Sequence, residues 1–260
     1  YIKSLGVTHV QLLPIYDFKS VDEAGPLGFG KAYNWGYDPQ NYNVPEGSYS
    51  TDPSDPAARI LELKQMIQTL HNEGLYVIMD VVYNHVFDVT TSPFNLTVPG
   101  YYFRYDAKGA LYNGTGVGNE TASEQPMFRK YMIDSLKYWA QEYDLDGFRF
   151  DLMGIHDTET MNLVEQELRS INPGIILLGE GWQMGNHADG VTPSDQYHAD
   201  RLPGYAFFND SLRDLLKGSV FDKADHGWIS GVKNTELAWD IFSNITGAQT
   251  VRNYLNPGQS

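Results

Sequence analysis

Apolar residues follow two spacings along the chain, one typical of buried strands and the other typical of helices. Short apolar runs predict five strands, at 7–14, 75–82, 146–151, 175–180 and 205–208. Apolar residues three and four positions apart predict helices, at 56–73, 128–143, 161–171, 210–217 and 235–243. Strands that alternate with helices indicate parallel pairing and right-handed crossovers. We therefore expect an α/β fold.

Two long segments interrupt this alternation, at 16–55 and 86–126. Connections of such length in a compact domain are usually either functional or disordered, and their many aromatic residues favour order. Within the second segment, 101–105 and 110–112 flank a turn and predict a hairpin. Because no linker or low-complexity stretch divides the chain, we expect residues 1–260 to belong to one domain with two long loops.

Composition narrows the class of protein and of ligand. The 260 residues suffice for an α/β barrel, which typically needs about 250. A net charge of −15 argues against nucleic acid and anionic membranes as partners, and no apolar run is long enough for membrane insertion. The absence of Cys excludes disulfides and thiolate metal sites. A neutral ligand is compatible, and the 18 Tyr and 5 Trp can stack on sugar rings, although core packing is their commoner use.

Carboxylates lie at the ends of three predicted strands, namely Asp80, Asp151 and Glu180. In parallel α/β folds, ligand sites lie at the carboxyl ends of the strands, so the three acids would converge on one pocket. The alternative is that each acid caps the helix that follows it. Three apolar strands that all end in this way favour a shared acidic site.

The surroundings of two of these acids suggest different roles. Alternate residues share one face of a strand, so Arg149 can hold Asp151 ionised, either for catalysis or as a structural ion pair. Glu180 follows an apolar run, and burial there would favour its protonated form, which suits a general acid. Such a pair of acids is the equipment of glycoside hydrolysis. The pattern alone is also compatible with a divalent-metal site built from the same acids and His85.

Several motifs, in order, resemble those of the α-amylase superfamily. Asp80-Val-Val-Tyr-Asn-His85, Gly147-Phe-Arg-Phe-Asp151 and Gly179-Glu-Gly-Trp182 resemble its first three signature regions. Tyr33-Asn-Trp-Gly-Tyr-Asp-Pro39 resembles the signature of type I pullulanases within it, as do stretches at 116–124 and 207–210. The resemblance covers nearly the whole chain. It implies a (β/α)8 TIM barrel of the α-amylase type, incomplete here, with roughly the second to sixth strands present. Residues 1–260 would then be part of one catalytic barrel domain, with long active-site loops at 16–55 and 86–126.

The resemblance also implies an activity, hydrolysis of α-1,6-glucosidic branch linkages in pullulan, amylopectin or glycogen-derived α-glucans by a retaining double displacement. Asp151 would be the nucleophile and Glu180 the general acid/base, with their carboxyl groups about 5–5.5 Å apart. Asn84 would support the geometry of the site, in a role that can involve calcium, or would contact the substrate. The implied substrate-binding residues are Tyr37 as the stacking floor, Asp80, His85, Arg149 as the residue that orients Asp151, and Trp182 on the acceptor side.

One departure from the family pattern is clear. The family has a fourth region that ends in His-Asp, whose Asp is a third catalytic carboxylate. Here 198–200 comes too early and Asp225-His226 is reversed. We therefore expect the central part of a catalytic domain, inactive by itself.

Other readings remain open alongside this one. They are an isoamylase-like debranching enzyme, an α-1,4-acting amylase, or a non-catalytic α-glucan-binding module. We expect no required cofactor, with structural calcium as an option. For location, we expect a secreted or cell-surface bacterial enzyme, with a cytoplasmic enzyme as the alternative.

Overall fold

A computed structural model describes residues 1–26 and 33–246 of the chain. It forms two compact units, Tyr1–Phe207 and Phe208–Ser260. The prediction that both belong to one barrel domain stays a prediction. Within the described part of the chain, no helix combines the length and the apolar character that crossing a membrane requires.

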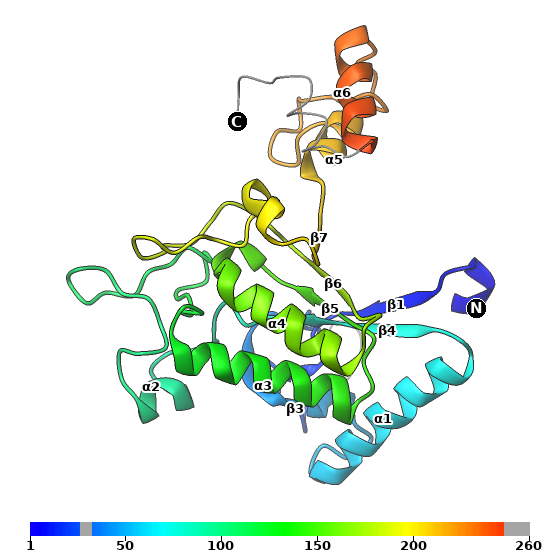
Figure 1. Cartoon of the computed structure of the whole chain (residues 1–260). Coiled ribbons are helices and arrows are strands. Elements are labelled where there is room, and N and C mark those ends of the chain that lie inside the picture. The colour runs from blue at the N-terminus through cyan, green and yellow to red at the C-terminus, as the bar shows by residue number, and fades with distance from the viewer. Residues whose placement is uncertain (27–32, 247–260) are drawn as a thin grey trace. The chain divides into compact units, whose positions relative to one another are not determined.

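The first unit is built on a sheet of five parallel strands, as the alternation of strands and helices predicted (Figure 1). The strands lie side by side in chain order, so each new strand adds to the same edge of the sheet. That is the order in which strands follow one another around a barrel. The strands are β1 (His9–Leu12), β4 (Tyr76–Val81), β5 (Gly147–Phe150), β6 (Ile176–Gly179) and β7 (Ala206–Phe207).

Three long helices connect these strands, α1 (Pro56–Asn72), α3 (Pro126–Glu142) and α4 (Thr158–Ile171). The side chain of Asp55 accepts a hydrogen bond from the Ala57 N–H and so caps α1, as predicted. Helices α3 and α4 pack against each other beside the sheet (Figure 1). Their predicted apolar stripes are buried in the core, with side chains that include Met132, Leu136, Trp139, Met161, Val164 and Leu168.

The two long segments contain more regular structure than their sequences indicated. Residues 16–55 hold an antiparallel pair, β2 (Tyr16–Phe18) and β3 (Pro39–Pro45), followed by the 3-10 helix η2 (Gly47–Tyr49). Residues 86–126 hold α2 (Pro93–Thr97). The hairpin expected there is reduced to one isolated bridge, Tyr105 with Leu111, while Phe103 forms a bridge with Thr121 outside the predicted hairpin. Three further 3-10 helices are η1 (Ile2–Leu5), η3 (Met153–Ile155) and η4 (Gln196–Arg201).

The described part of the second unit contains the two helices predicted there, α5 (Asp210–Lys217) and α6 (Thr235–Ile245). Each begins after an Asn whose side-chain oxygen accepts a backbone N–H. Asn209 accepts from Leu212, and Asn234 accepts from Leu237. Asn is among the preferred residues at this capping position, which explains where both helices start.

Candidate active site

The register of three neighbouring strands sets the position of the acids. Asp80 of β4 pairs with Arg149 of β5, and Phe150 of β5 pairs with Gly179 of β6. The ladder continues one step further, because the Asp151 and Glu180 N–H groups donate to the carbonyls of the neighbouring strands, each at 3.0 Å. Parallel pairing therefore brings the three acids to one edge of the sheet.

Arg149 lies between these acids and contacts all three. Its Nη1 is 2.9 Å from Asp80 Oδ1 and 3.0 Å from Asp151 Oδ1. Its Nη2 is 2.6 Å from Glu180 Oε1. Asp151 and Glu180 thus contact neighbouring nitrogens of a single guanidinium, and the structure brings the predicted catalytic pair together.

The surroundings of Glu180 differ from the expectation, which was wrong on this point. The surroundings of Glu180 are not purely apolar, because Arg149 pairs with one of its oxygens. The Leu152 N–H also donates to the other oxygen at 3.2 Å. Leu152 adopts the left-handed conformation, with φ 41°, directly after Asp151. The sequence suggested burial but gave no sign that Arg149 would reach across to the next strand.

Asp151 is held from two sides. Asn84 Nδ2 donates to Asp151 Oδ2 at 2.9 Å and to its backbone carbonyl at 2.8 Å, while Arg149 contacts Oδ1. Burial raises the pKa of the Asp151 carboxyl, and the Asn84 hydrogen bond and the Arg149 charge oppose that shift. Both carboxylate oxygens are therefore fixed in direction, one by Asn84 and the other by Arg149.

Asp80 and Tyr37 form the next layer of the cluster. The Tyr37 hydroxyl donates to Asp80 Oδ2 at 2.6 Å, and the Arg149 guanidinium lies 5.9 Å from the centre of the Tyr37 ring. Burial raises the pKa of Asp80 to about 6, although the Arg149 charge and the Tyr37 hydrogen bond oppose the shift. Burial also raises the pKa of Tyr37, so its hydroxyl keeps the proton that it donates.

His85 joins the cluster through two contacts that fix its ring. Nδ1 lies 2.6 Å from Asn84 Oδ1, and Nε2 lies 3.0 Å from the Tyr37 carbonyl oxygen. Burial lowers the pKa of His85 to about 4, so the ring is neutral near pH 7. A neutral ring carries one N–H and therefore donates to only one of these two oxygens. Tyr37, from the segment before β3, is thereby connected to the end of β4.

Within the described range 33–246, no hydrogen bond connects the Trp182 side chain to this network. It is half-buried in the loop after β6, two residues beyond Glu180. Its backbone passes close to Gly154, where a Cβ would lie 1.9 Å from the Trp182 carbonyl oxygen. Position 154 therefore needs glycine, and the loop after Asp151 packs directly on the loop after Glu180.

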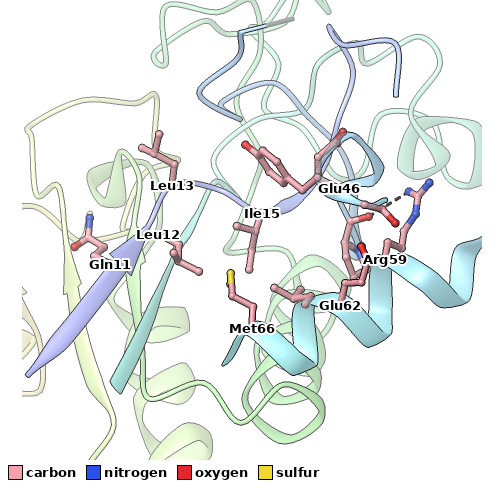
Figure 2. Close-up of a pocket in the computed structure, with 12 residues that line it drawn as sticks. Gln11, Leu12, Leu13, Ile15, Glu46, Arg59, Glu62 and Met66 are labelled. Atoms are coloured by element: carbon pink, nitrogen blue, oxygen red, sulfur yellow. Dashed lines mark hydrogen bonds between the residues drawn. The ribbon is translucent and has the colours of Figure 1, made fainter. Parts of the chain in front are cut away.

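A cavity of about 470 Å³ lies elsewhere, beside β1 and α1 (Figure 2). Apolar side chains form most of its wall, among them Leu12, Ile15 and Met66, with Glu46 and Arg59 at one side. None of the predicted site residues lines it. The acidic cluster is therefore the better candidate for chemistry.

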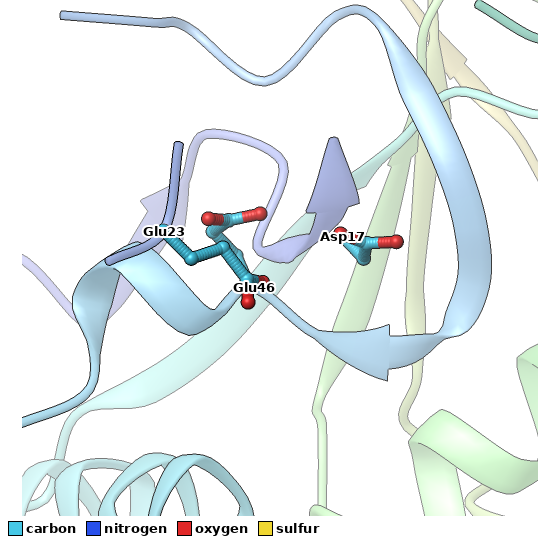
Figure 3. A group of neighbouring side chains, drawn as sticks. All are labelled: Asp17, Glu23 and Glu46. Carbon is cyan, nitrogen blue, oxygen red and sulfur yellow. The ribbon is translucent and has the colours of Figure 1, made fainter. Parts of the chain in front are cut away.

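A second group of acids, Asp17, Glu23 and Glu46, lies in the 16–55 segment (Figure 3). One oxygen from each lies within 4.8 Å of the others, which is close enough to hold a metal ion. However, Arg59 forms two hydrogen bonds with Glu23, at 2.8 and 2.7 Å. These acids already have partners, and the direct ion pair of Arg59 competes with any cation.

Comparison with known proteins identifies the family. Residues 1–97 match the family model described as the catalytic domain of alpha amylase. The pullulanase of Bacillus subtilis strain 168 is 49% identical over 248 residues, which is 95% of this chain and 34% of that protein. The chain belongs to the pullulanases of the α-amylase superfamily. It spans about a third of the length of this relative.

Solved pullulanase structures agree in fold. The pullulanase of Anoxybacillus sp. LM18-11, complexed with maltotetraose, is 50% identical and superimposes with a TM-score of 0.91 over 96% of this chain and 36% of its own. The pullulanase of Paenibacillus barengoltzii, complexed with maltohexaose and alpha-cyclodextrin, is 56% identical, with a TM-score of 0.85 over 90% of this chain and 36% of its own. The five parallel strands are therefore part of an α-amylase-type (β/α)8 barrel, as predicted.

Proposed function

We propose that this chain supplies the catalytic acids of an enzyme that hydrolyses α-1,6-glucosidic branch linkages in pullulan, amylopectin or glycogen-derived α-glucans. The observation that carries the proposal is the contact of Arg149 with Asp80, Asp151 and Glu180 at the carboxyl edge of the sheet. The malto-oligosaccharides bound by the crystallised relatives support an α-glucan as the ligand.

In the first step, an oxygen of Asp151 attacks the anomeric carbon and forms a covalent glycosyl ester. The bond from that carbon to the leaving oxygen breaks, and Glu180 gives its proton to that oxygen. Asn84 and Arg149 point the attacking carboxylate, because each contacts one of its oxygens. Fixing a nucleophile in this way reduces the entropy that the reaction must lose.

In the second step, Glu180 takes a proton from a water molecule, and the water oxygen attacks the same carbon. The ester bond to Asp151 breaks, and the product keeps the α configuration. Proton donation in the first step requires a Glu180 oxygen to face the leaving oxygen, whereas one of its oxygens lies 2.6 Å from Arg149 and the other accepts from the Leu152 N–H at 3.2 Å. We therefore expect Glu180 to turn from Arg149 when the glycosidic oxygen binds.

The surrounding residues would bind the sugar at the cleaved bond. Tyr37 offers its ring beside the acids while its hydroxyl is held by Asp80. We expect Nε2 of His85 to leave the Tyr37 carbonyl and hydrogen-bond a sugar hydroxyl when the glucan binds, while Nδ1 stays against Asn84. Trp182 would stack on the acceptor side.

The activity belongs to a longer enzyme in this proposal, because the chain covers 34% of its relative from Bacillus subtilis. We expect the third carboxylate of the family to come from outside this chain, so residues 1–260 alone should not hydrolyse pullulan. We further propose that the reaction needs no cofactor, with structural calcium as an option. We also propose that the enzyme is secreted or exposed on a bacterial cell surface.

The test is an assay of the longer enzyme on pullulan, with NMR detection of the first-formed anomer. The proposal expects the release of maltotriose with an α-anomeric reducing end. Hydrolysis of amylose in preference to pullulan would indicate an α-1,4-acting amylase. Tight binding of pullulan without any turnover would indicate a glucan-binding module. A β-anomeric product would refute the roles given to Asp151 and Glu180.

A further inference from the structure

Glu120 is a fully buried carboxylate that the proposed reaction does not use. Its Oε2 accepts a hydrogen bond from the Gly114 N–H at 3.1 Å, and its Oε1 accepts one from the Asn186 N–H at 3.0 Å. Gly114 lies in the 86–126 segment, whereas Asn186 lies in the loop that follows Glu180. One side chain therefore joins two segments that are far apart in the sequence.

The two segments meet backbone to backbone at this point. A Cβ on Gly114 would lie 2.6 Å from the Gly185 Cα and 2.3 Å from Glu120 Oε2. Gly185 itself has φ +92°, a backbone conformation that residues other than glycine rarely adopt. Both positions thus need glycine, and the loop after Glu180 has little freedom to move relative to Gly114.

The other side of this contact is fixed to the end of β4. The Thr121 N–H donates to the Asn84 carbonyl at 2.9 Å. The Asn119 side chain accepts from the Val86 N–H at 3.1 Å and donates to the Val86 carbonyl at 2.7 Å. Residues 119–121 are therefore hydrogen-bonded to the segment that carries Asn84 and His85.

We propose that Glu120 is a positioning residue for the acid step, which it serves by holding the loop after Glu180 against the segment after β4. It acts through the Asn186 N–H and touches neither of the two catalytic acids. The loop that it holds begins with Glu180 and Trp182, the groups that would face the leaving sugar. The effect on turnover rests on the proposed function, whereas the effect on the loop does not.

The chemistry of the contact explains why a carboxylate is needed. Two backbone N–H groups from opposite sides require two acceptor oxygens on one side chain. Gln has the same shape but only one oxygen, so it can satisfy only one of the two donors. Ala satisfies neither, and leaves two donors without a partner in the interior. Glu120→Ala should therefore loosen the loop after Glu180 more than Glu120→Gln does.

The first test is amide hydrogen exchange in the longer enzyme without substrate. We expect exchange at Asn186 or its neighbours to rise roughly tenfold in Glu120→Ala and less in Glu120→Gln. The matched control is Glu46→Gln, because Glu46 is also buried and also accepts two backbone N–H groups, from Phe18 and Ser48. That variant should change exchange in the 16–55 segment only. Unchanged exchange at 181–190 in both Glu120 variants would overturn the proposal.

The second test compares pullulan with α-maltotriosyl fluoride, a substrate whose leaving group needs no proton. We expect Glu120→Gln to lower kcat/KM on pullulan roughly tenfold and to lower kcat/KM on the fluoride much less, since kcat/KM reports the first step and only pullulan needs a proton from Glu180 in that step. Equal losses on both substrates would show a general structural defect and refute the positioning role. If the unaltered longer enzyme hydrolyses neither substrate, the proposed function fails, and hydrogen exchange alone decides the role of Glu120.

Discussion

Two regions of the molecule each place one arginine beside three carboxylates. At the edge of the parallel sheet, Arg149 contacts Asp80, Asp151 and Glu180 directly. In the 16–55 segment, Arg59 pairs with Glu23, while Asp17 and Glu46 lie within reach of the same group. By residue type alone the two regions look alike.

The difference lies in what the carboxylate oxygens bind. Glu46 uses both oxygens for backbone N–H groups, at Phe18 and Ser48, and Asp17 accepts from Asn41. These hydrogen bonds stabilise the fold of the β2–β3 region, and in them the acids accept from groups of the same segment. At the sheet edge the acids contact mainly side chains, with the Leu152 N–H that donates to Glu180 as the exception, and two of them lie directly after strands. An acidic cluster is thus better judged by the partners of its oxygens than by its composition.

The largest expected effect comes from Asp151, the proposed nucleophile. Asp151→Asn in the longer enzyme should lower kcat on pullulan on the order of 10⁴-fold or more, because no covalent intermediate can form. Asp17→Asn changes an acid of the other cluster in the same chemical way and should leave kcat within about twofold. Steady-state kinetics on pullulan measures both. Comparable losses of kcat in the two variants would show that the two clusters do not differ in their importance for turnover.

A smaller effect is expected at Glu180, the proposed general acid. Glu180→Gln should lower kcat on pullulan by roughly 10²–10⁴-fold, the usual contribution of a general acid. The first step on α-maltotriosyl fluoride should be nearly unchanged, and the covalent intermediate should accumulate because the second step lacks its base. Mass spectrometry of the intact protein detects that adduct. Normal pullulan hydrolysis by this variant would remove Glu180 from the mechanism.

The second cluster should matter for stability rather than for turnover. Glu23→Ala removes the partner of a largely buried guanidinium, since the Arg59 side chain is 11% exposed and Glu23 27%. We expect a loss of about 1–3 kcal/mol in the free energy of unfolding, measured by urea denaturation, with kcat retained. Lys130→Ala, which opens a pair exposed on both sides, serves as the control and should change little.

The smallest change in stability at neutral pH is expected for His156. In the part of the chain that the structure describes, this buried side chain contacts neither a charged side chain nor a backbone group through a hydrogen bond. Among the described residues, neither ring nitrogen has a hydrogen-bond partner. Burial, with the Arg104 charge, lowers the pKa of His156 to about 3. Its contribution to stability is therefore complete above the unfolded pKa near 6.5 and declines as the pH falls towards 3.

The corresponding variant is His156→Leu. At pH 7 it should be almost neutral, because no hydrogen bond is lost. At pH 4 it should be more stable than the natural sequence by up to about 3 kcal/mol. Urea denaturation at both pH values measures the difference. A strong loss of stability at pH 7 would show that His156 has a partner which the described residues do not provide.

Hydrophobic periodicity was sufficient to predict the parallel strands and the long helices. Buried runs such as 75–82 and capped stripes such as 56–73 carry strong local signals. The convergence of Asp80, Asp151 and Glu180 also followed from the pattern, because parallel strands place their carboxyl ends at one edge. These features depend on short-range preference and on topology.

Other features depended on contacts between distant segments. Strand β3 begins and ends with Pro and is largely polar, so it lacks the usual strand pattern. The surroundings of Glu180 depend on an arginine from the neighbouring strand, and the role of Glu120 depends on two backbone N–H groups. A sequence identifies the donor and acceptor types at each position but not which backbone groups they will face.

A single guanidinium among three carboxylates leaves this edge of the sheet with excess negative charge. The field there favours a sugar ring that gains positive charge as its bond to the leaving oxygen weakens. Basic sugar mimics that are already cationic should therefore bind more tightly than neutral sugars of the same shape. High salt should narrow that preference only slightly, since ions in solution screen buried charges weakly. The grouping that orients the acids thus also selects ligands by charge.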